Sequence, residues 1–255
     1  MRVPVIAGNW KCHTRLDSAR ALAAGLRERI DAVAGVEKVV CPPFVYLPAV
    51  REALAGSSIG VGAQDVHWED DVAATGEVGP QMVAELAEYV IIGHSERRHQ
   101  LGETDEMVNR KVQAALMAGL KPIMCVGEKL EERETGRTEE VLVRQTRSGL
   151  AGVAPPDGFV IAYEPVWAIG TGNAATVEDA VAAIDCIRQE VASMSGVAKA
   201  ATVRVLYGGS VTPENVAEFV SQEAIDGALV GGDSLKVDAF SAIVRETARV
   251  KAGSR

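Results

Sequence analysis

The chain contains 255 residues, of which 47% are hydrophobic and 24% are charged, a composition that is typical of globular proteins and excludes collagen-like or wholly disordered chains. The formal net charge of −9 gives no electrostatic support for a nucleic-acid partner, and none is expected. No segment approaches the roughly 20 consecutive apolar residues of a membrane helix, so no membrane association is expected.

Eight short apolar runs, rich in residues that favour β-strands, alternate with longer amphipathic stretches. Several runs are apolar at nearly every position, which is typical of parallel strands covered on both faces. The pattern predicts strands at residues 3–7, 38–41, 59–63, 89–92, 122–126, 159–163, 203–207 and 228–230.

Helices are predicted between the strands from apolar residues repeated at spacings of three and four. Clear examples are residues 16–26 and 181–191. Thr104, Thr176 and Thr212 each precede acidic residues, and each predicts a helix N-cap.

Eight strand–helix units in a chain of this length predict an α/β fold, a single (β/α)8 TIM barrel that forms one domain over residues 1–255. A doubly wound open sheet is the alternative, but it normally carries a glycine fingerprint after the first strand, where this chain has Asn9, Trp10 and Lys11. Residues 64–79 show no helical pattern, and connections this long in compact domains usually have a function.

The residues that follow the predicted strands form the candidate site, because the carboxyl ends of barrel strands carry the active site. Most of these residues are polar or ionisable, or are glycines. They are Asn9, Lys11, Pro42, Gln64, Asp65, His94, Ser95, Glu96, Gly127, Glu128, Glu164, Gly208, Gly209, Ser210, Gly231 and Gly232. The early and middle strands supply charged and acid–base groups, and the last two supply glycines.

Gly208-Gly209 and Gly231-Gly232 together predict a phosphate-binding region. Their backbone amides are not shielded by side chains, and loops after the seventh and eighth barrel strands often bind phosphate together with a short helix. Residues 234–236 could form that helix. Turn glycines are the alternative interpretation of each pair taken alone.

Glu164, His94 and Lys11 are the candidate acid–base and charged groups. Burial at the end of an apolar strand would raise the pKa of Glu164 and make it a usable base, although a salt-bridged structural glutamate is an equal alternative. His94 precedes a predicted helical turn whose positive end disfavours the imidazolium, so a neutral, hydrogen-bonding ring is expected. A structural core histidine and a solvated lysine are the alternatives for His94 and Lys11.

Four cysteines are scattered along the chain without a CxxC pair, which predicts free thiols in a reducing, cytoplasmic compartment. Cys125 is expected to be buried near the site. The histidines lack metal-ligand spacing with cysteine or aspartate, so no metal is predicted, and no other cofactor is expected. The charge-dense residues 128–140 predict an exposed helical surface.

Five segments resemble the triosephosphate isomerase family in their order and spacing. They are residues 7–11 (Ala-Gly-Asn-Trp-Lys), 92–98 (Ile-Gly-His-Ser-Glu-Arg-Arg), 162–172 (Ala-Tyr-Glu-Pro-Val-Trp-Ala-Ile-Gly-Thr-Gly), 207–210 (Tyr-Gly-Gly-Ser) and 229–232 (Leu-Val-Gly-Gly). The resemblance covers nearly the whole chain, and the segment around Glu164 is highly specific by itself.

The resemblance implies an intramolecular aldose–ketose isomerase of glycolysis and gluconeogenesis that interconverts dihydroxyacetone phosphate and D-glyceraldehyde 3-phosphate through an enediol(ate). From the roles known in this family, Glu164 moves a proton between neighbouring carbons and neutral His94 polarises the carbonyl. Lys11 neutralises negative charge on the substrate and the intermediate, and Asn9 donates a hydrogen bond nearby.

The same resemblance implies residues for binding and support. Gly170, Ser210, Gly231 and Gly232 would hold the phosphate through backbone amides, together with the contacts of Asn9 and Lys11. Ser95, Glu96 and Cys125 would support the catalytic groups. Residues 165–175 resemble the family's lid, whose closure excludes water from the reaction.

Thr75, Gly76 and Glu77 resemble the family's dimer loop, which implies a homodimer in which this loop approaches the other subunit's pocket. Ala74, Gly79 and Asp65 depart from the family pattern in this region. Asp233 departs from it beside the predicted phosphate amides, where its carboxylate could repel the phosphate or turn outward to cap Leu235 and Lys236.

Three other functions fit the sequence less well than this resemblance. An isomerase of a related four-carbon ketose phosphate would alter the first-strand motif, which is intact here. A silent barrel kept for binding would have lost Lys11, His94 or Glu164. An aldolase or synthase would need a metal or a lysine after a late strand, and no lysine stands there. The expected ligand is therefore a small triose phosphate.

Overall fold

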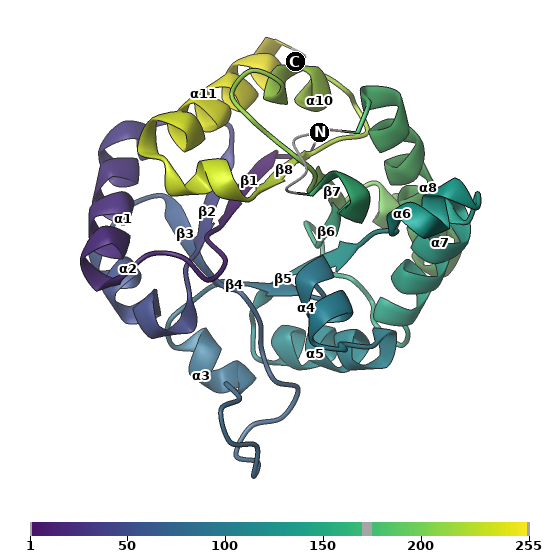
Figure 1. The fold of residues 1–255 in the computed structure, drawn as a ribbon, viewed down its shortest axis with the longest axis horizontal. Coiled ribbons are helices and arrows are strands. Elements are labelled where there is room, and N and C mark those ends of the chain that lie inside the picture. Colours follow the sequence, from purple (N-terminus) through teal and green to yellow (C-terminus); the bar gives the residue numbers. More distant parts are fainter. Residues whose placement is uncertain (1, 170–174, 254–255) are drawn as a thin grey trace.

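The computed structural model describes residues 2–169 and 175–253, in which eight parallel strands close into a barrel. The strands pair in sequence order and β1 pairs with β8, which confirms the predicted (β/α)8 TIM barrel (Figure 1). They are β1 (Val5–Asn9), β2 (Glu37–Cys41), β3 (Ile59–Ala63), β4 (Tyr89–Ile92), β5 (Lys121–Val126), β6 (Val160–Tyr163), β7 (Arg204–Tyr207) and β8 (Gly227–Val230).

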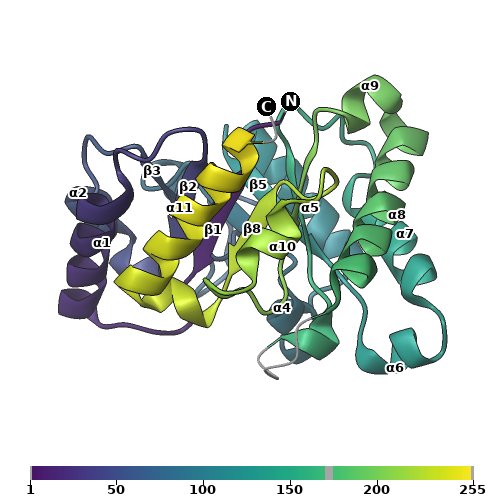
Figure 2. The ribbon, with the colours of Figure 1, turned by 90° about the horizontal axis from the view of Figure 1, so that it is seen from above.

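Helices cover the outside of the barrel (Figures 1 and 2). They are α1 (Leu16–Ile30), α2 (Leu47–Ala53), α3 (Pro80–Ala84), α4 (Ser95–Gln100), α5 (Asp105–Met117), α6 (Leu130–Glu134), α7 (Thr138–Gly149), α8 (Val177–Ser195), α9 (Val197–Ala200), α10 (Val216–Val220) and α11 (Val237–Gly253), with 3-10 turns η1 (Phe44–Tyr46), η2 (Val166–Ala168) and η3 (Gly232–Leu235). Across the described residues, no helix is both long and apolar enough to cross a membrane.

The strand and helix boundaries follow local chemistry. The first strand starts at Val5, two residues later than predicted, because Pro4 has no N–H for the ladder. Thr104 and Thr176 cap α5 and α8 as predicted, each accepting a backbone N–H. Thr212 caps the turn that leads into α10 and not α10 itself: its Oγ1 accepts the N–H of Glu214 (3.3 Å), and its own N–H donates to Asn215 Oδ1 (2.8 Å).

The strands are apolar at nearly every position because they are buried between two apolar layers, one inside the barrel and one beneath the helices. Val5 and Ala7 share a face of β1 with Asn9 and belong to a cluster of buried side chains from alternating strand positions inside the barrel. Ile6 points the other way into the larger core beneath the helices. Because both faces of each strand are buried, alternation of polar and apolar residues is lost.

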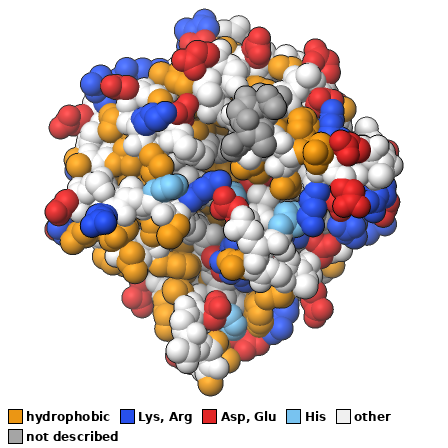
Figure 3. All heavy atoms as spheres, viewed as in Figure 1, with side chains coloured by type: hydrophobic (Ala, Val, Ile, Leu, Met, Phe, Trp, Pro, Cys, Tyr) orange, Lys and Arg blue, Asp and Glu red, His pale blue; other side chains and the backbone are white. Residues whose placement is uncertain are grey.

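The loop at residues 64–79 projects well beyond the ring of helices (Figures 1 and 3). It contains no helix or strand, as predicted. The guanidinium of Arg110 lies 4.5 Å from the ring centroid of Trp68 and pairs with Glu69, which fixes the loop against α5. The tip is solvent-exposed in the single chain.

A buried ion cluster joins the base of this loop to α4 and α5. Lys111, only 2% exposed, contacts Asp65 (2.7 Å) and Glu103. Arg97 pairs with the same two carboxylates, at 2.8 Å and 3.3 Å. Burial raises the pKa of Asp65, and the ammonium of Lys111 opposes that rise. Two buried carboxylates are therefore matched by two cations.

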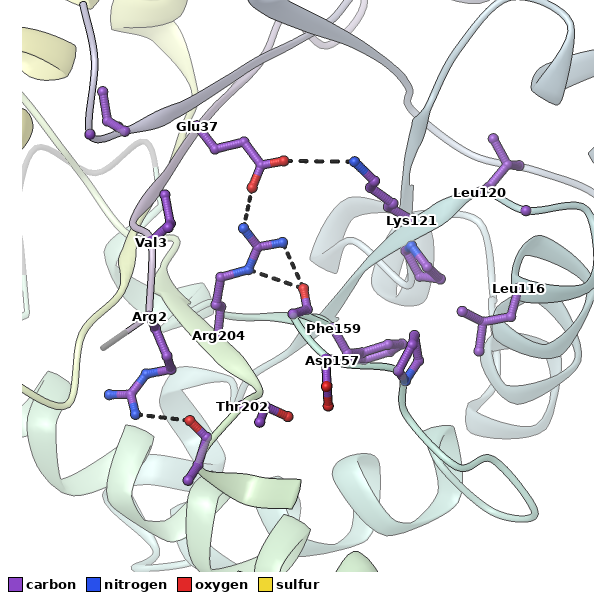
Figure 4. A pocket seen from close by; sticks show the side chains of 17 residues that line it. Arg2, Val3, Glu37, Leu116, Leu120, Lys121, Asp157, Phe159, Thr202 and Arg204 are labelled. Carbon is purple, nitrogen blue, oxygen red and sulfur yellow. Dashed lines mark hydrogen bonds and ion pairs between the residues drawn. The ribbon is translucent and has the colours of Figure 1, made fainter. Parts of the chain in front are cut away.

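The amino ends of the strands surround a cavity of about 1040 Å³ on the side of the barrel away from the strand carboxyl ends. In Figure 4, Glu37 faces Arg204 and Lys121 across this cavity. Glu37 also accepts a hydrogen bond from Tyr89, and Arg204 donates to the carbonyl of Gly158 (3.0 Å). The charged groups here thus pair with one another.

We predict that Lys111→Met lowers the free energy of unfolding by about 3–5 kcal/mol, because it leaves two buried carboxylates with one cation. Lys121→Met is the matched control: Lys121 is 58% exposed on its side chain, and its loss should cost less than about 1 kcal/mol. Urea unfolding at one fixed protein concentration measures both. Equal losses in the two variants would contradict the prediction.

Candidate active site

One pocket of about 270 Å³ lies at the carboxyl ends of the strands and gathers most of the predicted site. Its lining includes Asn9, Lys11, His94, Glu164, Ser210, Gly231 and Gly232. These residues come from the ends of five strands, β1, β4, β6, β7 and β8. Gly170 and the central part of the predicted lid lie outside the described residues. Thr75, Gly76 and Glu77 lie on the projecting loop and do not line this pocket.

Glu164 lies directly after β6, closely packed between the ends of the two neighbouring strands. Its backbone N–H continues the ladder to Val126 (2.8 Å), and its residue surface is 2% exposed. A Cβ at Gly127 would overlap the Glu164 carbonyl oxygen, and one at Gly208 would lie 3.0 Å from Glu164 Cγ. The two glycines therefore allow the flanking strands to approach the carboxylate closely.

The carboxylate of Glu164 contacts His94 directly. Oε1 lies 2.9 Å from His94 Nε2, and Oε2 accepts the backbone N–H of Ser95 at 2.9 Å. Burial raises the pKa of Glu164, but the contact with His94 and the Ser95 hydrogen bond outweigh it, so the pKa lies below its usual value. This differs from the expected rise, because burial here comes together with two donors.

His94 is the N-cap of α4, and its Nδ1 accepts the backbone N–H of Glu96 at 3.3 Å. An N–H can only donate, so Nδ1 carries no proton and the ring proton is on Nε2, facing Glu164. Burial lowers the pKa of His94, while the adjacent carboxylate of Glu164 raises it above the usual value. The raised pKa of His94 depends on its contact with Glu164. The hydrogen bond from Glu96 N–H to Nδ1 does not depend on that contact, because it forms at the start of α4.

Lys11 has a φ of 50°, a backbone conformation that residues other than glycine rarely adopt. Asn9 Oδ1 accepts its N–H (3.0 Å), and Gln64 Nε2 donates to its carbonyl (2.8 Å). Its ammonium pairs with Glu96 at 2.6 Å. These contacts direct the lysine into the pocket, and they agree with the expected support from Glu96.

Gly231, Gly232 and Ser210 line the part of the pocket that is formed after β7 and β8. The N–H groups of Gly232 and Asp233, at the start of η3, have no acceptor among the described residues. The Ser234 hydroxyl donates to the Gly231 carbonyl (2.6 Å) and holds the turn. This part of the pocket therefore offers unpaired backbone donors to an anion.

The structure corrects one prediction: Glu128 is fully buried, although residues 128–140 were expected to form an exposed surface. Its Oε1 accepts hydrogen bonds from Tyr163 (3.1 Å) and Trp167 Nε1 (2.8 Å). Arg133 stacks on the Trp167 ring at 4.3 Å. Glu128, the first residue of the charged run, thus links Tyr163 of β6 to Trp167 after Glu164. The surface helices α6 and α7 begin only after it.

Two further residues support the loops around His94 and Glu164, and of these only Cys125 was expected there. Arg98 donates to the carbonyls of Gly93 (2.7 Å) and Cys125 (3.0 Å), which links the His94 loop to β5. Cys125 is fully buried beside Glu164, and burial with that carboxylate raises the pKa of its thiol. In the described part of the chain, no three His, Cys, Asp or Glu side chains cluster as metal ligands would.

A closed barrel with a carboxylate, an imidazole and an ammonium group at its strand carboxyl ends defines a barrel enzyme with an acid–base site. Residues 4–247 match the family described as triosephosphate isomerase, and the chain belongs to that family.

Similar proteins carry the same description. Triosephosphate isomerase of Dehalococcoides mccartyi is 49% identical over 251 residues, which cover 98% of this chain and 100% of that protein. Those of Carboxydothermus hydrogenoformans and Thermoanaerobacter pseudethanolicus are 51% and 52% identical over 248 residues, covering 96% of this chain and 99% of each relative.

The lowered pKa of Glu164 predicts a specific acid dependence of stability. Ionised Glu164 stabilises the fold above the pKa of a glutamate in an unfolded chain, about 4.3, and this stabilisation is lost as the pH falls through the lower folded value. The unfolding free energy of the parent minus that of Glu164→Gln should therefore shrink from about pH 6 to about pH 3. Urea titrations at several pH values test this, and a constant difference would refute it.

Proposed function

We propose that this protein interconverts dihydroxyacetone phosphate and D-glyceraldehyde 3-phosphate by proton transfer through an enediol(ate), in glycolysis and gluconeogenesis in the cytoplasm. The observation that carries the proposal is the direct contact between Glu164 and His94 in a pocket that also contains Lys11 and unpaired backbone donors. Membership of the triosephosphate isomerase family supports the same reaction. All four cysteines are free thiols, which agrees with a reducing compartment.

Glu164 is the base in this proposal. Its carboxylate takes a proton from the carbon beside the substrate carbonyl, and the electrons of that C–H bond form the carbon–carbon double bond of the enediolate. The same carboxyl returns the proton to the neighbouring carbon. Because Glu164 is ionised and buried beside hydrogen-bond donors, the base is in its active form before the substrate arrives.

His94 is the electrophile that polarises the carbonyl. A substrate bound between the two side chains would replace the Glu164 contact of Nε2–H with the carbonyl oxygen. The influence that raises the pKa of His94 would then weaken, and the Glu96 N–H on Nδ1 would keep the ring neutral. Lys11 and Asn9 would stabilise the negative charge that develops on the substrate oxygens.

The phosphate group is assigned to the part of the pocket that is formed after β7 and β8. Gly231, Gly232 and Ser210 would bind it through main-chain N–H groups, as backbone amides at a turn or helix start commonly do. Gly170 is assigned to the same task from the family resemblance. No observation favours the four-carbon ketose phosphate as the substrate.

We predict that Glu164→Gln reduces kcat by about 10²–10⁴-fold or more while triose phosphate still binds, because the variant keeps the shape of the side chain but not its basicity. A coupled assay with glyceraldehyde 3-phosphate, run beside a four-carbon ketose phosphate, measures both the activity and the substrate. Turnover close to that of the parent, or preference for the four-carbon substrate, would contradict the proposal.

We further propose that the protein is a homodimer whose projecting loop completes the other subunit's pocket. The loop tip at Thr75, Gly76 and Glu77 is exposed in the single chain. Val72 and Met82 nearby expose apolar side chains, at 45% and 53%. Such a projection of exposed apolar and polar groups suits insertion between subunits better than isolation in water.

Thr75→Arg should shift the protein toward monomers and lower kcat, because a long cation replaces a small side chain at the tip of the inserting loop. Thr138→Arg, at the start of α7, is the matched control and should remain dimeric and active. Sedimentation velocity over a range of concentrations measures the assembly. A parent that sediments as a monomer would exclude the homodimer.

A further inference from the structure

Asp233 lies in the part of the pocket assigned to the phosphate, although its charge has the wrong sign for an anionic ligand. It follows Gly232 directly, lines the pocket with Gly231, and has a side chain that is 17% exposed. A carboxylate so close to unpaired backbone donors must lower their effective attraction for a phosphate dianion. Its charge therefore needs a compensating partner.

The net charge of the pocket lining is negative, which adds to the repulsion of an anionic ligand. Among the described lining residues, Lys11 is one cation against the two carboxylates Glu164 and Asp233, a net formal charge of −1 with His94 neutral. Lys11 is itself paired with Glu96 outside the lining. Side-chain charge alone cannot attract a dianion to such a pocket, so each uncompensated carboxylate weakens binding directly.

Lys236 supplies the compensation from outside the pocket. Its Nζ lies 2.9 Å from Asp233 Oδ1, and Lys236 directly follows η3, the 3-10 turn that contains Asp233. Lys236 is 71% exposed and does not line the pocket. The hydrogen bond and charge of Asp233 raise the pKa of Lys236, which keeps it protonated.

We propose that the Asp233–Lys236 pair is an electrostatic device that sets the affinity of the pocket for the phosphate dianion. Lys236 cancels the carboxylate that would otherwise repel the ligand, and Asp233 holds the ammonium outside the pocket. The phosphate is then bound by oriented backbone dipoles and not by a free cation. The substrate statement rests on the proposed isomerase function, whereas the pairing rests on this geometry.

A double-mutant cycle tests the pair. Lys236→Ala should raise KM by about three- to tenfold, the effect of one uncompensated charge several ångströms from a dianion at a solvated surface, with a smaller change in kcat. Asp233→Ala should leave KM unchanged or lower it. The double variant Asp233→Ala/Lys236→Ala should return KM to within about twofold of the parent, because the repelling group is gone.

Salt and a matched pair provide controls. The KM rise in Lys236→Ala should diminish between about 0.05 M and about 0.5 M salt, because exposed charges are screened. Asp157 and Lys199 form a similar exposed pair, 2.7 Å apart, and Asp157 borders the cavity at the amino ends of the strands. The same cycle at that pair should leave KM and kcat unchanged.

Calorimetric titration with inorganic phosphate measures binding at the same subsite without turnover. The phosphate dissociation constant should follow the KM pattern across the four proteins. If the parent fails to isomerise triose phosphates, the proposed function fails, yet the phosphate titrations still decide the pair. Identical phosphate affinity in all four proteins, or a KM rise in Lys236→Ala that Asp233→Ala does not reverse, would overturn the inference.

Discussion

The contact between the Glu164 carboxylate and the His94 imidazole is the interaction on which the site depends. It brings together groups that lie 70 residues apart in the chain, on two strands separated by β5. Closure of the barrel makes the meeting possible, and Gly127 and Gly208 remove the side chains that would obstruct it. The two charged or polar groups share a space from which water is largely excluded, so each controls the protonation of the other.

The start of α4 provides backbone hydrogen bonds to both members of this pair. The N-terminus of α4 presents one N–H to His94 Nδ1 and another to the Glu164 carboxylate. The same turn of backbone therefore leaves Nδ1 as the acceptor nitrogen of the imidazole and stabilises the carboxylate of Glu164, the proposed base. A base that is ionised and an acid that is neutral are what proton abstraction beside a carbonyl requires.

The proposed substrate carries a phosphate dianion, although both the chain and the pocket lining carry net negative charge. Local charge pairs would limit the repulsion. Lys11 forms an ion pair with Glu96, and Asp233 forms one with Lys236. The buried carboxylates of Asp65 and Glu103 pair with Lys111 and Arg97. Main-chain donors at η3 remain available because their positions in a first turn leave them without partners.

The sequence by itself determined the fold class, the strand positions to within about two residues and most of the pocket. It could do so because parallel strands buried on both faces read as apolar runs, and because the residue after each strand must lie at one end of the barrel. His94, Glu164 and Lys11 could be chosen on position alone. The homodimer, the roles of these residues and the single domain remain proposals.

Only the tertiary structure decided the interactions between distant segments. Burial predicted a raised pKa for Glu164, but donors from α4 reverse its direction. Glu128 looks like a surface charge in sequence, and only the approach of Tyr163 and Trp167 makes it a buried acceptor. The left-handed backbone conformation of Lys11 was equally hidden. Local pattern specifies which face of a strand or helix is buried, whereas charge states depend on neighbours that the chain brings together only when the barrel closes.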